Sequence, residues 1–89
     1  MKKSVGEKIS DVWGVPKTVI MDIPSLSIQG NREMRVENYK SLLKYTREEV
    51  AILTKTLTVR IYGRELKIDQ MNVDMLLISG FFEKIEYKN

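Results

Sequence analysis

The chain has 89 residues, a formal net charge of +3, and neither cysteine nor histidine. This length suits one domain with a modest core, and the missing residue types exclude disulfides, thiolate metal sites and any mechanism that needs an imidazole base. The Lys2-Lys3 start lacks the apolar run of a signal peptide, and no segment reaches the roughly 18 apolar residues of a membrane span, which predicts a cytoplasmic protein without a transmembrane segment.

Residues 1–24 are predicted to form a short helix followed by a linker. Apolar residues at helical spacing, ended by Gly14, indicate an amphipathic helix over residues 3–13. Three supports fit this stripe: the rest of the domain, a partner protein, or the edge of a bilayer. Between Pro16 and Pro24, either a second short helix or an extended strand fits the sequence. The stripe is a candidate interaction surface and consists of Val5, Ile9, Val12 and Trp13.

From residue 25 onward, apolar residues alternate with polar ones in four successive units. A period of two predicts half-buried β-strands. We expect residues 25–89 to form an all-β domain, a small antiparallel β-sandwich or roll of about eight short strands built as four hairpins. A β-solenoid is the alternative. The units recur about every 16 to 19 residues, and repeats of this length form the coils of a solenoid, whose strands stack in parallel.

Each hairpin has a predicted register that sets apolar side chains opposite each other. The third hairpin is the clearest, because Gly63-Arg64 suits a type II′ turn. In the fourth, the alternative is one strand that continues through Gly80 with Phe82 facing inward. The expected pairs are Leu26–Val36 with Ile28–Met34, Leu43–Ile52 with Tyr45–Val50, Val59–Ile68 with Ile61–Leu66, and Leu76–Tyr87 with Ile78–Ile85.

The middle of the chain is basic. Residues 32–67 carry nine basic and five acidic side chains, whereas residues 68–89 carry two basic and four acidic ones. The third register sets Arg60 opposite Lys67 on the outward face, close to Arg64, and these three form a candidate basic face. Three interpretations fit: a solvated face that resists aggregation, a docking surface for an acidic partner, or a nucleic-acid surface.

Aromatic residues suggest two binding functions. Tyr62 lies between Arg60 and Arg64, so a small basic β-barrel that binds nucleic acid is the alternative function. Phe81 and Phe82 precede the acidic Glu83, and an exposed member of this pair fits a protein–protein contact better.

Catalytic patterns are absent from the sequence. Glu48 and Glu49 are neighbours that point apart, the serines have no activating base, and the five glycines stand singly, so no phosphate-binding loop is present. We therefore predict a protein that is not an enzyme and that has no catalytic residue, cofactor or metal.

An ordered set of segments resembles the YabP/YqfC family of sporulation proteins, closer to its YqfC branch. The set begins with PKTVIMDIP at residues 16–24, Gly30, and VENY at residues 36–39. It continues with LKYT at 43–46, LTVRIYG at 57–63, LKI at 66–68 and ISG at 78–80. The resemblance covers about residues 15–88, and its specificity lies in the order of the whole set.

The resemblance implies a role in endospore formation in the mother cell of a Firmicute. It implies a binding or scaffold module that works with a membrane-associated sporulation partner, with peripheral contact at the forespore membrane. Self-association is a further expectation, since an open solenoid assembles through its ends. Glu37 and Asn38 are candidate recognition contacts; the alternative is that Asn38 bonds backbone groups at a strand end or bulge.

Overall fold

The computed structural model describes residues 23–89, which form a single antiparallel β-sheet of six strands. The strands follow the order β1-β2-β6-β5-β4-β3 across the sheet. The predicted all-β class is confirmed, and the solenoid alternative is wrong because every neighbouring pair of strands is antiparallel. The predicted N-terminal helix lies outside the described residues. The strands are β1 (Ser25–Gln29), β2 (Glu33–Glu37), β3 (Tyr39–Tyr45), β4 (Glu49–Thr54), β5 (Thr58–Met71) and β6 (Met75–Lys88).

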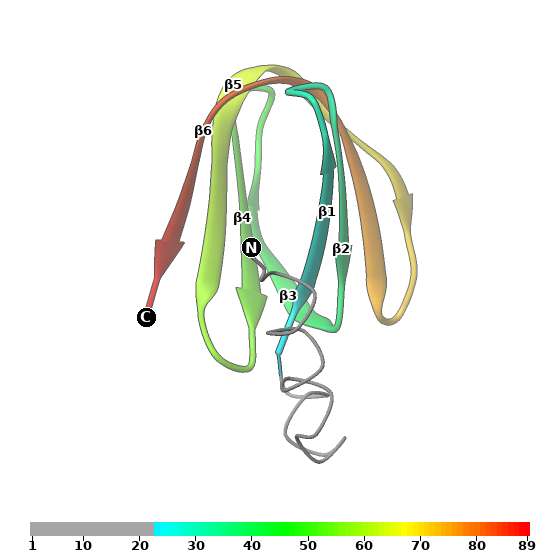
Figure 1. Cartoon of the computed structure of the whole chain (residues 1–89), viewed down its shortest axis with the longest axis vertical. Helices are drawn as coiled ribbons and strands as arrows, with labels where there is room; N and C mark the ends of the chain where they lie inside the picture. The colour runs from blue at the N-terminus through cyan, green and yellow to red at the C-terminus, as the bar shows by residue number, and fades with distance from the viewer. Residues whose placement is uncertain (1–22) are drawn as a thin grey trace, which may run out of the picture.

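Two long strands fold this sheet back on itself (Figure 1). β5 and β6 each have 14 residues and bend near their middle. The beginning of β5 pairs with β4 and with the end of β6, whereas the beginning of β6 pairs with β2 and with the end of β5. The sheet therefore has two facing layers joined by the bend. The roll is built from six strands, not from about eight short ones.

Glycine allows the two long strands to approach closely at the bend. A Cβ atom on Gly63 would lie 2.0 Å from the backbone oxygen of Phe81, and one on Gly80 would lie 2.8 Å from that of Glu65. Gly80 has a φ of 140°, and Glu65 has a φ of 53° within an irregular stretch of β5. Such bulges bend a strand and increase its twist.

The predicted hairpin turn at Gly63-Arg64 is therefore wrong. β5 continues through both residues without a hairpin turn, and the φ of Gly63 is not positive. The glycine is needed because a neighbouring backbone comes close, which local turn chemistry does not reveal. For β6, the alternative is confirmed: the strand continues through Gly80, and Phe82 faces the core with 6% of its surface exposed.

Some of the predicted cross-strand pairs are observed and others are not. Both pairs of the first hairpin are confirmed. In the second, Tyr45 faces Val50 as predicted, but a bulge in β3 sets Leu42 opposite Ile52 and leaves Leu43 53% exposed. The third and fourth sets of pairs are wrong because β5 and β6 pair with each other; the observed pairs include Val59–Tyr87, Ile61–Ile85, Ile68–Ile78 and Met71–Leu76.

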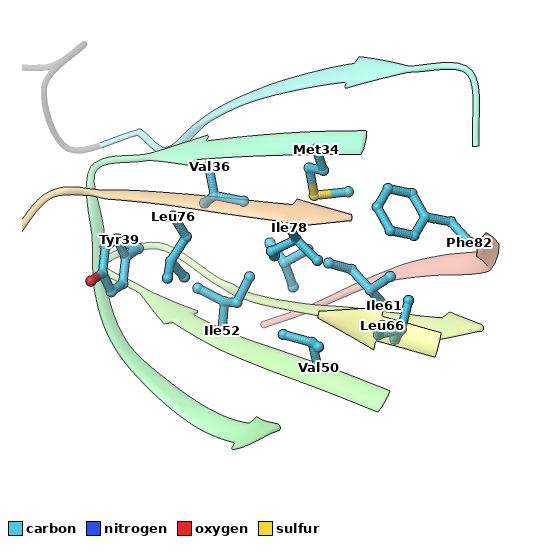
Figure 2. Close-up of a cluster of buried hydrophobic side chains, with 11 residues drawn as sticks. Met34, Val36, Tyr39, Val50, Ile52, Ile61, Leu66, Leu76, Ile78 and Phe82 are labelled. Atoms are coloured by element: carbon cyan, nitrogen blue, oxygen red, sulfur yellow. The ribbon is translucent and has the colours of Figure 1, made fainter. Parts of the chain in front are cut away.

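The core lies between the two layers (Figure 2). Inward-facing side chains of β2 and the beginning of β6 meet those of β4 and the beginning of β5, while Leu66 and Phe82 come from the two strands at the bend. Alternation along each strand places these residues inward, and removing their surfaces from water is the main stabilising term. The cluster consists of Met34, Val36, Tyr39, Val50, Ile52, Val59, Ile61, Leu66, Leu76, Ile78 and Phe82.

Loops cover the backbone where the long strands run past their shorter neighbours. Beside β5, the β3–β4 loop accepts hydrogen bonds from the amides of Gly63 and Leu66, at 3.1 Å and 2.8 Å. The amide of Ile68 donates to the hydroxyl of Tyr45 at 3.1 Å. These bonds satisfy donors that β4 is too short to reach. On the other side of the bend, the β1–β2 turn covers β6 in the same manner.

Candidate functional site

At the bend lie two residues that were predicted from the sequence as functional for different reasons. Phe81 is a candidate interaction residue and Arg64 a candidate basic residue, and they are cross-strand partners between β6 and β5. The β1–β2 turn lies against them, because the amides of Gly80 and Phe82 donate to the backbone oxygens of Arg32 and Asn31, at 3.1 Å and 2.8 Å. A third side chain, that of Arg32, is thereby brought to the ring of Phe81.

Two guanidinium groups share this ring. The Cζ atom of Arg32 lies 4.2 Å from the centroid of the Phe81 ring, and that of Arg64 lies 4.9 Å from it. Each such contact contributes about 0.5–1 kcal/mol at an exposed site. Glu83 completes the group, since Arg64 Nε donates to its Oε2 at 3.1 Å. We refer to Arg32, Arg64, Phe81 and Glu83 as the arginine cluster.

The arginine cluster holds its cations in place while keeping them accessible. Arg32 Nε donates to the backbone oxygen of Gly80 at 3.0 Å. The side chains of Arg64 and Glu83 are 64% and 58% exposed. In the described part of the chain, both guanidinium groups form hydrogen bonds through Nε alone and both arginines are exposed, so their Nη donors are available for binding. Two arginines against one glutamate leave the cluster positively charged.

On the outer face of β3, β4 and the beginning of β5, two basic side chains are engaged by one carboxylate. Glu49, on β4, accepts from Lys44 Nζ at 2.9 Å and from Arg60 at 2.8 Å, and its side chain is only 18% exposed. The pKa of the Glu49 carboxyl lies below its ordinary 4.5, chiefly through the hydrogen bond from Lys44; burial opposes this shift and Arg60 reinforces it. Arg60 is therefore engaged in a cross-strand ion pair.

Tyr62 is also engaged. Its hydroxyl donates to Glu86 Oε1 at 3.2 Å, and Lys84 Nζ lies 5.3 Å from the centroid of its ring. The pKa of the Tyr62 hydroxyl is raised above 10.0, first by burial and then by the hydrogen bond to the Glu86 carboxylate. Tyr62, which lies between two arginines in the sequence, thus has an acidic hydrogen-bond partner in the structure.

The three residues of the candidate basic face are placed separately. Arg60 faces Glu86 across β5 and β6, whereas Lys67 faces Ser79, so the predicted Arg60–Lys67 pair is wrong. It is wrong because the turn that would have set them opposite does not exist. Arg60 and Arg64 have the carboxylate partners described above. The third member, Lys67, has a long ion pair of 3.9 Å with Asp69.

Asn38 serves the backbone at the junction of β2 and β3. It has a φ of 66°, its backbone N–H donates to the backbone oxygen of Asp74 at 2.8 Å, and its side-chain Nδ2 donates to the backbone oxygen of Ile23 at 3.1 Å. Asparagine is among the few residues that tolerate this left-handed conformation. Two interpretations of Asn38 fitted the sequence, and this arrangement matches the second, in which Asn38 bonds backbone groups at a strand end. Glu37 is exposed at the end of β2.

The other candidates fall into separate places. Phe82 belongs to the core and only Phe81 reaches the surface. The apolar stripe of Val5, Ile9, Val12 and Trp13 lies outside the described residues. Sequence reasoning missed Arg32, which is 48 residues from the Gly80 carbonyl it binds, and no local signal marks it.

Three other features of residues 23–89 bear on function: a cavity, metal binding and membrane spanning. An open cavity of about 590 Å³ lies between the β3–β4 loop and the bulge of β5, lined by Tyr45, Thr46, Arg47, Glu65, Leu66 and Lys67. No group of three or more acidic side chains in this part of the chain is placed to hold a metal ion. The same residues contain no helix long and apolar enough to cross a membrane.

Comparisons with known proteins support the resemblance set out above. The sequence model of the YabP family matches residues 22–89. A relative described as "Uncharacterized protein YqfC" from Bacillus subtilis (strain 168) is 26% identical over 73 residues, which cover 82% of this chain and 78% of that protein. No solved structure matches the chain at a significant level. The predicted resemblance to the YabP/YqfC family is thereby confirmed.

Proposed function

Because this chain belongs to the YabP family, we propose that it acts in endospore formation as a non-enzymatic binding module. Its partner in this proposal is a membrane-associated protein that holds it at the forespore membrane. The family resemblance supports the developmental setting. The mode of action is argued from the arginine cluster, which is the observation that carries the proposal.

The arginine cluster has the chemistry that an acidic peptide segment requires. A guanidinium group is planar, stays charged at all physiological pH values, and pairs with a carboxylate through two parallel hydrogen bonds. The Phe81 ring already orders both arginines, so less side-chain entropy is lost when a ligand binds. Glu83 marks the position at Arg64 that a carboxylate of the partner would take over.

Tyr62 gives nucleic-acid binding weaker support. A base stacking on this ring would displace the ammonium group of Lys84, and the adjoining phosphate would meet the carboxylate of Glu86. Aromatic platforms for single strands instead lie in positively charged grooves. An acidic protein segment is therefore the favoured ligand.

The experiment measures binding of the full chain to a fluorescent glutamate-rich peptide and to single-stranded DNA of equal charge. We expect the peptide to bind, and the double change Arg32→Gln with Arg64→Gln to weaken binding by about tenfold or more, as loss of two guanidinium contacts at an interface does. Arg35→Gln is the matched control, because Arg35 is an exposed arginine on β2 outside the cluster. Equal losses in both variants, or tighter binding to DNA, would contradict the proposal.

A second experiment tests the setting in cells. The wild-type chain, the double variant and Arg35→Gln are used to capture proteins from detergent-solubilised membranes of sporulating cells, followed by mass spectrometry. We expect one membrane protein to be retained by the wild type and the control but lost with the double variant. Recovery of nucleic-acid-associated proteins instead would argue against the adaptor function, and normal spore counts without the gene would argue against the developmental role.

A further inference from the structure

The two ends of the sheet differ in how they are protected. β3 ends the sheet on one side with Lys40 and Lys44 in the strand and with two register shifts. Charged side chains and bulges are the usual devices that prevent an edge strand from pairing with another chain. β1 ends the sheet on the other side with the sequence SLSIQ, which has no charged residue, and its register is regular throughout.

Other free backbone in the described part of the chain is also covered or charged. The end of β6, beyond its pairing with β2, carries Glu83, Lys84, Glu86 and Lys88. Beyond its pairing with β4, β5 is covered as far as Ile68 by the β3–β4 loop and by the hydroxyl of Tyr45, and it carries the charged Lys67 and Asp69 there. Among the edges of residues 23–89, β1 alone combines a regular register with an uncharged strand. β1 is therefore the edge of the sheet best suited to pair with a strand of another chain.

We propose that β1 pairs with β1 of a second copy of this chain, antiparallel, about a two-fold axis at Ser27. In this register Leu26 of each copy faces Ile28 of the other, and Ser25 faces Gln29. An isologous contact requires such a self-complementary pattern. Ile28 is 42% exposed, and the second strand covers it with an apolar side chain. The inference does not depend on the acidic ligand proposed above.

The charge distribution favours this occupant. Since β1 carries no charge, two copies approach without opposing like charges, whereas a symmetric pairing of β3 centred on Leu42 sets Lys40 of each copy opposite Lys44 of the other. The joined sheets form one continuous sheet with two arginine clusters. A five-residue strand provides a small interface, so we expect a dimer that forms only as the concentration rises.

Sedimentation velocity of the full chain over a wide range of concentrations tests the proposal with the variant Ser27→Glu. Within one chain the new carboxylate faces Arg35, an opposite-charge pair that favours the folded monomer. Across the two-fold axis the two new carboxylates face each other, and we expect the dissociation constant of the dimer to rise by about fivefold or more. Ser41→Glu is the matched control, since Ser41 is exposed on the opposite edge, and it should leave dimerisation unchanged.

A charge exchange identifies the axis. Ser27→Lys should also weaken dimerisation, because two ammonium groups then face each other, and an equimolar mixture of Ser27→Lys with Ser27→Glu should restore it. The proposal is overturned by a wild-type chain that stays monomeric at every concentration, which includes the case in which residues 1–22 cover β1. It is also overturned by a dimer that Ser41→Glu weakens as much as Ser27→Glu does.

Discussion

Replacing Gly63 by alanine tests the bend on which the fold and the arginine cluster depend. The added Cβ would lie 2.0 Å from the backbone oxygen of Phe81, a distance that such contacts essentially never show. Because backbone and not a flexible side chain is the obstacle, β5 and β6 must move apart by about 1 Å to reach a tolerable 3.0 Å or more. That movement stretches the neighbouring hydrogen bonds beyond their normal range.

The magnitude follows from these terms. Losing two ladder hydrogen bonds costs about 1 kcal/mol each, and the overpacking that remains adds about 1–3 kcal/mol. The free energy of unfolding should therefore fall by about 3–5 kcal/mol, a large part of the total for a domain of this size. Urea denaturation followed by circular dichroism measures the change; with a slope of about 1 kcal/mol per molar, the midpoint falls by about 3–5 M.

Gly30→Ala is the matched control. Gly30 has a φ of 55° but no heavy atom within 4 Å of the added Cβ, so alanine there meets only backbone strain of about 1–2 kcal/mol. The expected order is a much larger loss at Gly63 than at Gly30. A Gly63→Ala protein as stable as Gly30→Ala would refute the close-approach argument, since an ordinary hairpin turn at Gly63 would give two similar losses.

Three further predictions concern single side chains. Phe82→Ala should lower the free energy of unfolding by about 3–5 kcal/mol because Phe82 lies in the core, whereas Phe81→Ala should lose only about 1–2 kcal/mol with its two cation–π contacts; equal losses in urea denaturation would contradict this assignment. The lowered pKa of Glu49 stabilises the fold above its ordinary 4.5, and this contribution is lost as the pH falls through the folded-state pKa; the urea midpoint should therefore drop on acidification more in the wild type than in Glu49→Gln. The raised pKa of Tyr62 affects stability in the opposite pH direction: its contribution to the free energy of unfolding is present below pH 10.0 and is lost as the pH rises through the folded-state pKa. Tyr62→Phe should reduce the alkaline loss of stability seen by circular dichroism, and an unchanged alkaline profile would show that Tyr62 is not the titrating group.

The arginine cluster was only partly predictable from sequence. Phe81 and Arg64 were nominated for separate reasons, one as an interface aromatic and the other as part of a basic face. Their proximity arises because β5 and β6 pair along their whole length. Arg32 joins them through the β1–β2 turn, which reaches β6 because β2 pairs with the beginning of that strand. Each of these contacts depends on strand order, which has no local signature.

The sequence by itself determined most of the inward-facing positions; the exceptions are Leu43, Tyr45 and Tyr87, which were expected to face inward and are exposed. A period of two follows from strand geometry residue by residue, so the inward positions of Met34, Val36 and Ile61 needed no knowledge of the rest of the fold. The first hairpin was also determined locally, because its strands are separated by only three residues, 30–32. Membership of the family rests likewise on the order of residues along the chain.

Only the tertiary structure decided which strands pair. Ile61 is apolar and inward in both arrangements, and its alternation is satisfied by Leu66 or by Ile85 alike. The choice between them depends on whether β6 pairs beside β5 at Gly63, a contact between residues far apart in the chain. Alternating strands accept many partners in register, so the burial of the whole core, summed over both layers, selects one pairing.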